Sequence, residues 1–280
     1  MNTKLKRLFL IDMDGTIYIG EKMFETTPSF LSAINKIGAN YVFFTNNSSK
    51  GRSEYLEKLN RMGIKTSAEK IISSTDAAAF YLLENHKNSL IYAFGTIAFC
   101  EELSAYGLNI TQNPDSAISV IVMGFDTELS YKKLWDICAL LCKNPKLAYV
   151  ATNPDITCPT EFGYIPDCGS FAQIIKNATG REPIFLGKPA PYMVDIALSR
   201  FSTSPKDAII VGDRLYTDIA CGIACNVDTA LVLSGETKRE DISCGLYSPT
   251  YIYKDVGEIA REITKTYQAA KEPMPPHFQQ

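Results

Sequence analysis

Residues 8–20, LFLIDMDGTIYIG, hold the stretch that decides the fold. Four apolar residues run without alternation into two carboxylates one residue apart, and Gly15 and Thr16 follow. An apolar run bounded in this way by a turn signal predicts a strand buried on both faces, as in a parallel sheet. Because ligands bind at the carboxyl ends of such strands, Asp12 and Asp14 stand where a site is expected.

The spacing of Asp12 and Asp14 places both carboxylates on one side of the chain, with Met13 on the other. Two carboxylates that close together repel each other unless a cation or a shared proton compensates. Mg²⁺ is the natural cation, because it prefers oxygen ligands. The alternative is a strand end whose acids cap a helix or face water.

The composition of the whole chain excludes several classes of protein. With 280 residues and 46% hydrophobic content, the chain can build a substantial core. A net charge of -3 gives no basic surface for a nucleic acid polymer or an anionic membrane. No apolar run is long enough to span a bilayer, and none at the N-terminus has the length of a signal peptide. We therefore expect a soluble cytoplasmic protein.

Cysteine and histidine supply no obvious site. The eight cysteines contain no CxxC pair, so they are interpreted as reduced packing residues of a cytosolic protein. The two histidines, His86 and His277, are too few and too isolated for a histidine metal site or a Ser-His-Asp triad.

A second apolar run has the same design as the first. Residues 40–51, NYVFFTNNSSKG, predict a strand that ends at Thr45 and Asn46 and a helix over 52–61, while residues 28–37 predict the preceding helix. Hydroxyl and backbone N–H groups at such a strand end suit an anionic oxygen. An ordinary capping loop is the alternative.

The pattern changes between residues 80 and 181, where three strands and three helices form a complete α/β set. We interpret this as an inserted domain, because about 100 residues is an ordinary domain size. The predicted organisation is 1–79 for the first part of the core, 80–181 for the insertion, 182–270 for the second part of the core and 271–280 for a disordered tail. Residues 155–169 are too rich in proline and glycine to continue a strand, so a loop facing the other domain is expected there.

Two further strand ends complete the pattern. PIFLGK predicts a strand with Lys188 at its end, before a helix opened by prolines, although a surface lysine is the commoner interpretation. AIIVGD places Asp213 where Asp12 sits on its own strand, and Asp218 follows in the first turn of a helix. Together the runs predict one Rossmann-like, doubly wound parallel sheet whose carboxyl edge gathers these groups.

This set of groups fits phosphoryl transfer. Asp12 would attack as nucleophile, and Asp14 would protonate the leaving oxygen and then activate water. Mg²⁺ would be held by Asp12, Asp213 and the backbone carbonyl of Asp14. The phosphoryl oxygens would be held by three groups: Thr45, the Asn46 backbone N–H and Lys188.

The motifs DMDGT, FFTNNS, GKP and GDRLYTDI, in that order, resemble the four motifs of the haloacid dehalogenase superfamily. The insertion between the second and third motifs, with ATNPD and GKPAPYM around its end, looks like class IIA, the NagD-like or para-nitrophenyl-phosphatase-like branch with a C2-type α/β cap. The resemblance implies a Mg²⁺-dependent phosphatase of a small phosphorylated metabolite. It also implies the same roles for Asp12, Asp14, Thr45, Lys188 and Asp213, with Asp218 as a supporting acid.

Several alternatives stay open at this point. A phosphotransferase would use the same intermediate, and a non-catalytic regulatory protein could retain the fold. Nucleoside monophosphates, phosphoglycolate, glycerol phosphate and sugar phosphates are all candidate substrates. Pyridoxal phosphate is less favoured, because the resembling vertebrate phosphatases carry a histidine in the loop at 155–169 and this chain has none there. A homodimer through the cap is also expected from the resemblance.

Overall fold

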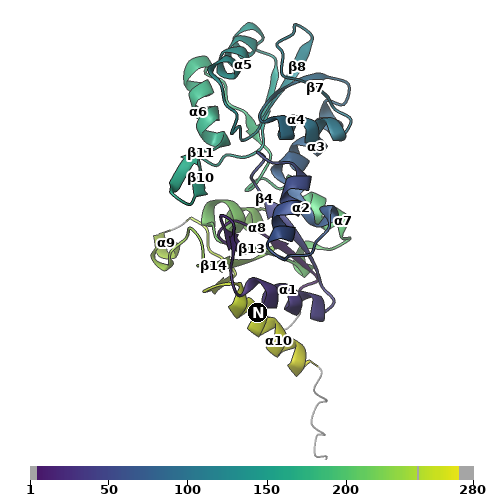
Figure 1. Cartoon of the computed structure of the whole chain (residues 1–280), viewed down its shortest axis with the longest axis vertical. Helices are drawn as coiled ribbons and strands as arrows, with labels where there is room; N and C mark the ends of the chain where they lie inside the picture. Colours follow the sequence, from purple (N-terminus) through teal and green to yellow (C-terminus); the bar gives the residue numbers. More distant parts are fainter. Residues whose placement is uncertain (1–4, 245, 271–280) are drawn as a thin grey trace, which may run out of the picture. The chain divides into compact units, whose positions relative to one another are not determined.

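The computed structural model describes residues 5–244 and 246–270, without the side chains of 243 and 244. The chain divides into two compact units, Met1–Tyr41 with Phe201–Gln280, and Val42–Arg200. Each contains a parallel sheet, helices and one antiparallel hairpin; the bounds of these elements are given below, and Figure 1 labels many of them.

The first unit contains a parallel sheet with the strand order β15-β14-β13-β1. β1 pairs with β13 from Leu8↔Ala208 to Ile11↔Val211, and every residue of both strands is buried. Burial on both faces explains why these strands are continuous apolar runs. The strands are β1 (Leu8–Ile11), β13 (Ala208–Gly212), β14 (Asp228–Val232) and β15 (Tyr251–Tyr253), with a hairpin of β2 (Tyr18–Ile19) and β3 (Lys22–Met23) after β1.

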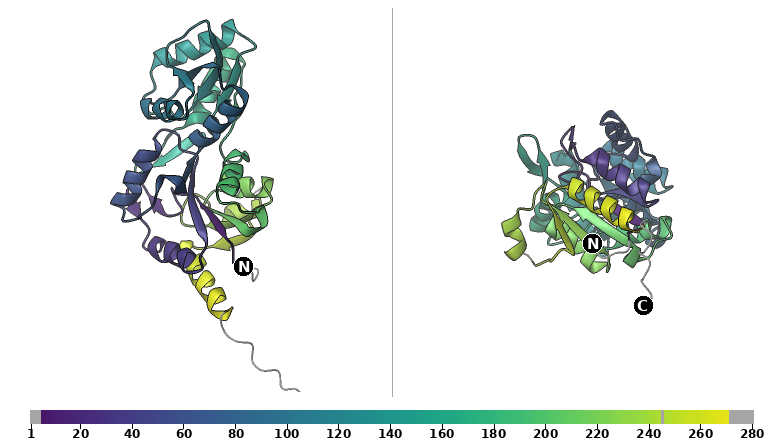
Figure 2. Two further views of the ribbon diagram at one scale, coloured as in Figure 1. Left: turned by 90° about the vertical axis from the view of Figure 1, so that its right-hand side faces the viewer. Right: turned by 90° about the horizontal axis from the view of Figure 1, so that it is seen from below.

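The helices of the first unit follow the expected signals. α1 starts next to Pro28, and Gly38, with φ 71°, follows its end. The side chain of Asp255 caps α10 by accepting from the backbone N–H groups of Gly257 and Glu258. α1 and α10 lie side by side (Figures 1 and 2). The helices are α1 (Thr27–Lys36), η2 (Pro205–Asp207), η3 (Leu215–Ile219), α8 (Ala220–Ala224), α9 (Arg239–Cys244) and α10 (Val256–Ala269).

The second unit begins inside β4 (Asn40–Thr45), which pairs in parallel with β5 (Ile71–Ser73). It also holds a five-stranded parallel sheet in the order β12-β9-β8-β6-β7. The strands of that sheet are β6 (Leu90–Phe94), β7 (Asn109–Thr111), β8 (Ile118–Met123), β9 (Ala148–Ala151) and β12 (Ile184–Phe185). The helices of the second unit are α2 (Arg52–Arg61), η1 (Ala68–Lys70), α3 (Ser74–Asn85), α4 (Ile97–Ala105), α5 (Tyr131–Lys143), α6 (Cys168–Thr179) and α7 (Tyr192–Arg200).

The five-stranded sheet is itself doubly wound. The chain moves from β6 to β7 through α4 in one direction, and from β8 to β9 and β12 through α5 and α6 in the other. Right-handed crossovers then place these helices on opposite faces. α5 and α6 pack together over one face, around a core that includes Phe94, Met123 and Phe171, and α4 lies on the other side (Figure 1).

The predicted fold class is therefore confirmed: a doubly wound parallel α/β core with a second α/β set between β5 and β13. The helix predicted over 52–61 is α2. The helix predicted over 28–37 is α1, which starts and ends one residue earlier. The boundaries 1–79, 80–181 and 182–270 stay predictions, and the tail at 271–280 lies outside the described residues.

The loop expected at 155–169 is wrong in part, because it contains an antiparallel hairpin. β10 (Thr157–Thr160) pairs with β11 (Gly163–Pro166), from Thr157↔Pro166 to Thr160↔Gly163. Proline is tolerated because both strands of a two-stranded ribbon are edges, so a missing N–H can face outward. The proline and glycine content of residues 155–169 therefore does not exclude a two-stranded hairpin.

The strand before Lys188 lies in the five-stranded sheet and not in the core sheet predicted from the sequence. The sequence grouped it with the strands of the first pattern, but β12 pairs with β9 through Ile184↔Val150 and Phe185↔Ala151. An apolar run of this length shows that a strand is buried, but it does not show which neighbour the strand pairs with.

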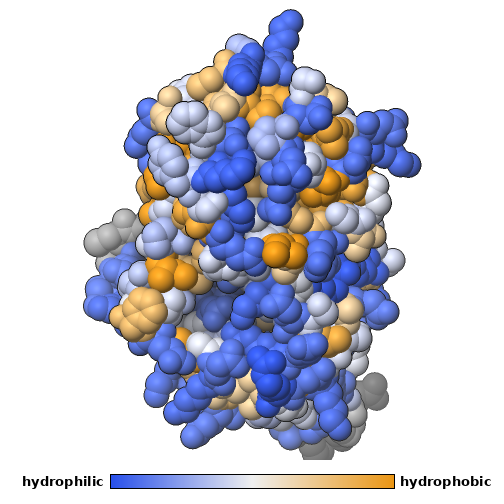
Figure 3. Space-filling model, turned by 45° about the horizontal axis from the view of Figure 1, so that its top comes forward, coloured by the Kyte–Doolittle hydropathy of each residue, from blue (hydrophilic) through white to orange (hydrophobic). Residues whose placement is uncertain are grey.

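Hydrophilic residues predominate on the face drawn in Figure 3, and apolar residues form small separate groups. Within 5–244 and 246–270, no helix combines the length and the apolar character needed to cross a membrane.

Candidate active site

Asp12 and Asp14 lie directly after β1. The Asp12 N–H donates to Val211 O at 2.8 Å, so the backbone is still paired with β13 where the first carboxylate leaves it. Asp12 is 9% exposed and Met13 is fully buried. The Tyr18 hydroxyl donates to Asp14 Oδ2 at 3.3 Å, which ties the second carboxylate to the start of the β2–β3 hairpin.

Asp213 follows β13 and is held in a narrow slot. Its Oδ2 accepts the backbone N–H of Glu236 at 2.7 Å, and its Oδ1 lies 3.5 Å from the Thr16 hydroxyl, which donates to it. A Cβ added at Gly15 or Gly235 would come within 2.4 Å or 2.0 Å of Asp213 Oδ2. Only glycine at these two positions lets the backbone approach the carboxylate so closely.

Asp218 lies in the first turn of a helix, as the sequence predicts, and that helix is a π-helix. Leu215–Ile219 form a π-helix, and α8 starts only at Ala220. Such π-turns occur often at functional sites. Asp218 is fully buried, and its Oδ2 accepts the Arg214 N–H at 3.2 Å. Gly212 makes room for it, since a Cβ there would lie 2.2 Å from Asp218 Cγ.

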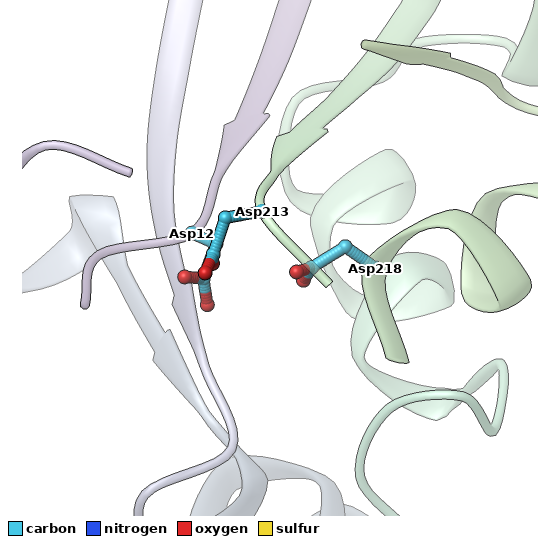
Figure 4. A group of neighbouring side chains, drawn as sticks. All are labelled: Asp12, Asp213 and Asp218. Atoms are coloured by element: carbon cyan, nitrogen blue, oxygen red, sulfur yellow. The ribbon is translucent and has the colours of Figure 1, made fainter. Parts of the chain in front are cut away.

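The three carboxylates form one cluster, in which an oxygen of each lies within 4.8 Å of the others. Figure 4 shows the groups of Asp12 and Asp213 side by side, with that of Asp218 pointing toward them. Burial, together with the charge of Asp218, raises the pKa of Asp213 to about 7. A cluster of hard oxygen donors that repel one another is the donor set that Mg²⁺ prefers, so the residues fit that cation.

The predicted phosphate contacts lie in the second unit, and the structure brings them together there. Thr45 ends β4 and is 5% exposed, while Lys188 is 2% exposed. Lys188 Nζ donates to Phe44 O at 3.0 Å and lies 5.0 Å from the centroid of the Phe44 ring. The side chain of Asn46 bonds to the backbone of Lys188 through both its oxygen and its nitrogen.

Sequence reasoning missed several contributors. It gave Asn46 a role only through its backbone N–H, whereas its side chain also forms hydrogen bonds with the backbone of Lys188. It also missed Gly235, the N–H of Glu236 and the hydroxyl of Thr16, which surround Asp213. A signal was present in the SGE triplet after the apolar run of β14, because a glycine beside polar residues at another strand end marks the same edge.

The chain matches the models of two known protein families and is similar in sequence to a group of enzymes. Residues 9–109 match the model of a haloacid dehalogenase-like hydrolase family, and residues 185–259 match a second model of HAD-hydrolase-like proteins. An acid sugar phosphatase of Staphylococcus saprophyticus is 33% identical over 92% of this chain and 98% of its own length. The chain belongs to the haloacid dehalogenase-like hydrolases.

Solved structures similar to this chain indicate which class of enzyme it belongs to within the family. A 4-nitrophenylphosphatase of Thermotoga maritima superimposes with a TM-score of 0.87 at 36% identity, covering 92% of this chain and 97% of that one. A glycerol phosphate phosphatase of Mycobacterium tuberculosis, in complex with magnesium, gives 0.84 at 28% identity, covering 93% and 77%. Within its family the chain is a phosphatase, a phosphoric monoester hydrolase of the NagD-like and para-nitrophenyl-phosphatase-like branch.

Proposed function

We propose that the protein is a Mg²⁺-dependent phosphatase of a small phosphorylated metabolite that works through an aspartyl-phosphate on Asp12. The observation that carries the proposal is the buried cluster of Asp12, Asp213 and Asp218. Asp12, Asp213 and the backbone carbonyl of Asp14 would hold the cation, with Asp218 supporting them. When bound, the cation offsets the negative charge of the phosphoryl group and of the carboxylates around it.

In the first step a carboxylate oxygen of Asp12 attacks phosphorus, and the bond from phosphorus to the ester oxygen breaks. Asp14, protonated, gives its proton to the leaving oxygen. In the second step Asp14 takes a proton from water, and that water attacks the phosphorus of the acylphosphate. Inorganic phosphate leaves and the Asp12 carboxylate is restored.

The phosphoryl oxygens need donors throughout both steps. Lys188 Nζ, the Thr45 hydroxyl and the Asn46 backbone N–H would supply them, because a dianion repels an attacking carboxylate unless its charge is neutralised. The burial of Lys188 and Thr45 supports this role, since hydrogen bonds to charged groups are stronger away from water.

Within the open set of substrates we favour a sugar phosphate or a polyol phosphate such as glycerol phosphate. The support is the naming of relatives as acid sugar phosphatase and glycerol phosphate phosphatase. Nucleoside monophosphates and phosphoglycolate are the competing candidates.

The decisive experiment is phosphate release from a panel of sugar phosphates, glycerol phosphate, phosphoglycolate, nucleotides and para-nitrophenyl phosphate, with Mg²⁺ and with EDTA. We expect turnover that EDTA abolishes and that Asp12→Asn lacks. Product analysis with added alcohols separates hydrolysis from transfer, since a phosphotransferase would form new phosphate esters. Turnover that survives EDTA or Asp12→Asn would overturn the mechanism.

The proposal also includes a cytoplasmic location and self-association through the second α/β set. The cysteine spacing, with no CxxC pair, supports the cytoplasmic location.

Self-association is supported by two exposed aromatic side chains. Tyr131 and Trp135 are 78% and 68% exposed and lie one turn apart on α5, where a second copy could cover them. Sedimentation of the wild type and of Trp135→Glu would test this, because a dimer through α5 should dissociate in the variant.

A further inference from the structure

The side chain of Asn46 pairs with the backbone of Lys188 as a neighbouring strand would. Its Oδ1 accepts the Lys188 N–H at 2.8 Å, and its Nδ2 donates to Lys188 O at 2.9 Å. Both bonds go to the same residue, so they fix the point from which the lysine side chain extends. Asn46 and Lys188 are 7% and 2% exposed, which shields these bonds from water.

Asp155 sets the orientation of that amide. The side-chain amide of Asn46 has two N–H donors, and the one not used by Lys188 donates to Asp155 Oδ2 at 2.8 Å. If the amide were flipped, its oxygen would face two acceptors, the Asp155 carboxylate and the Lys188 carbonyl. The carboxylate therefore favours the one orientation in which Asn46 can bind the backbone of Lys188.

Asp155 is in turn held firmly. Asn153 Nδ2 donates to Asp155 Oδ2 at 2.9 Å and to Asp167 Oδ1 at 3.2 Å, and the Thr152 hydroxyl donates to Asn153 Oδ1 at 2.9 Å. The Gly169 N–H closes the base of the β10–β11 hairpin on Asp155 O at 2.8 Å. A buried polar network with its members joined in this way is rigid.

We propose that Asp155 is a positioning residue for Lys188, acting through the side-chain amide of Asn46. The inference rests on the proposed function, in which Lys188 binds the phosphoryl group. It adds a residue from the ATNPD stretch, distant in sequence from both, whose contribution to the reaction passes through the lysine.

A double-mutant cycle tests this coupling, with kcat/KM for para-nitrophenyl phosphate as the readout. We expect Asp155→Ala to lower kcat/KM by about 10-fold, since it removes a buried charge-assisted hydrogen bond. In the Lys188→Met background the same substitution should change kcat/KM by less than about 2-fold, because the group that Asp155 positions is gone.

Two further variants separate positioning from loss of structure. Asp155→Asn keeps an oxygen that can accept from Asn46, so it should restore most of the activity lost in Asp155→Ala. Asp126→Ala is the matched control, because Asp126 is also buried at 2% exposure but bonds to Lys133 and to the Glu128 N–H. It should lower the thermal midpoint without changing the effect of Lys188→Met.

The outcomes are distinguishable. If Lys188→Met leaves kcat/KM unchanged, the phosphate role of Lys188 fails, and the positioning of Lys188 fails with it. If Lys188→Met is impaired but Asp155→Ala has the same effect in both backgrounds, only the positioning role of Asp155 is overturned. An Asp155→Asn variant as impaired as Asp155→Ala would also overturn it.

Discussion

The backbone N–H of Glu236 donates to Asp213 Oδ2 at 2.7 Å, which fastens the segment after β14 to the carboxylate that follows β13. Gly235, one residue earlier, permits this approach, because any Cβ there would meet the same oxygen at 2.0 Å. The candidate metal site thus depends on a residue that carries no side chain.

Gly235→Ala should weaken Mg²⁺ binding. The added methyl group must displace the Asp213 carboxylate, so we expect the Mg²⁺ concentration for half-maximal activity to rise by about 10-fold or more, on the scale of losing one well-placed interaction. A titration of activity against Mg²⁺ measures this. Gly51→Ala is the control, since its Cβ would meet nothing closer than 3.5 Å and its φ is negative. Equal titration curves for the two variants would contradict the claim that Mg²⁺ binding needs a glycine at position 235 beside the Asp213 carboxylate.

Asp14→Asn should separate the two chemical steps. An amide cannot protonate the leaving oxygen, and para-nitrophenolate needs no proton whereas an alkoxide does. We therefore expect the variant to form the aspartyl-phosphate from para-nitrophenyl phosphate but not from glycerol phosphate. Because the second step still lacks its base, stopped-flow mixing should show a burst of nitrophenolate that approaches one per enzyme. Steady nitrophenolate release with no burst would contradict the assignment of Asp14.

The parts of the site that could be predicted from the sequence are those that depend on strand ends. Asp12 and Asp213 each follow a buried apolar run, and parallel strands bring their carboxyl ends to one edge, so residue order alone predicts that they meet. Family resemblance then gave each residue a role.

What could not be predicted depends on the partner that a segment finds. Nothing in PIFLGK says that its strand pairs with β9, and nothing in TCPTEFGYIP says that prolines can sit on both strands of a hairpin. The side chain of Asn46 was overlooked for the same reason. An amide is equally suited to capping its own loop and to binding a segment far along the chain, as Asn46 does with Lys188.

The raised pKa of Asp213 predicts a pH-dependent stability in the metal-free protein. Its pKa rises from 3.8 to about 7 on folding, so the folded state favours the protonated acid. The stability that this group contributes is fully present below pH 4 and is lost as the pH rises toward 7. In EDTA, the thermal midpoint of Asp213→Asn should therefore exceed that of the wild type by more at pH 8 than at pH 5.

Mg²⁺ should reverse this difference. A cation that binds the ionised carboxylates stabilises the folded wild type by mass action, and more at pH 8 than at pH 5 because protons compete less. Differential scanning calorimetry of the wild type and of Asp213→Asn at pH 5 and at pH 8, each with EDTA and with Mg²⁺, gives the thermal midpoints under these four conditions. Parallel pH profiles for the wild type and Asp213→Asn in EDTA would show that Asp213 is not the group responsible.

Arg52 joins three helices of the second unit, and its removal should destabilise the fold. Its Nη2 donates to Asp76 Oδ1 and, at 2.6 Å, to the hydroxyl of Tyr106, the C-cap residue of α4. The other oxygen of Asp76 caps α3 by accepting the Ser73 N–H at 2.7 Å. Asp76 is 2% exposed, so Arg52→Met leaves a buried carboxylate without this cation. We expect the free energy of unfolding to fall by about 3 kcal/mol.

Urea unfolding of Arg52→Met beside Lys176→Met provides the comparison. Lys176 and Glu182 form an ion pair at 2.5 Å, but their side chains are 42% and 62% exposed. A pair in that setting contributes about 1 kcal/mol or less, because water already solvates both charges. The first variant should therefore lose several times more stability than the second. Equal losses would mean that the Arg52 cluster stabilises the unit no more than a surface pair does, and that the packing of α2, α3 and α4 is sufficient without it.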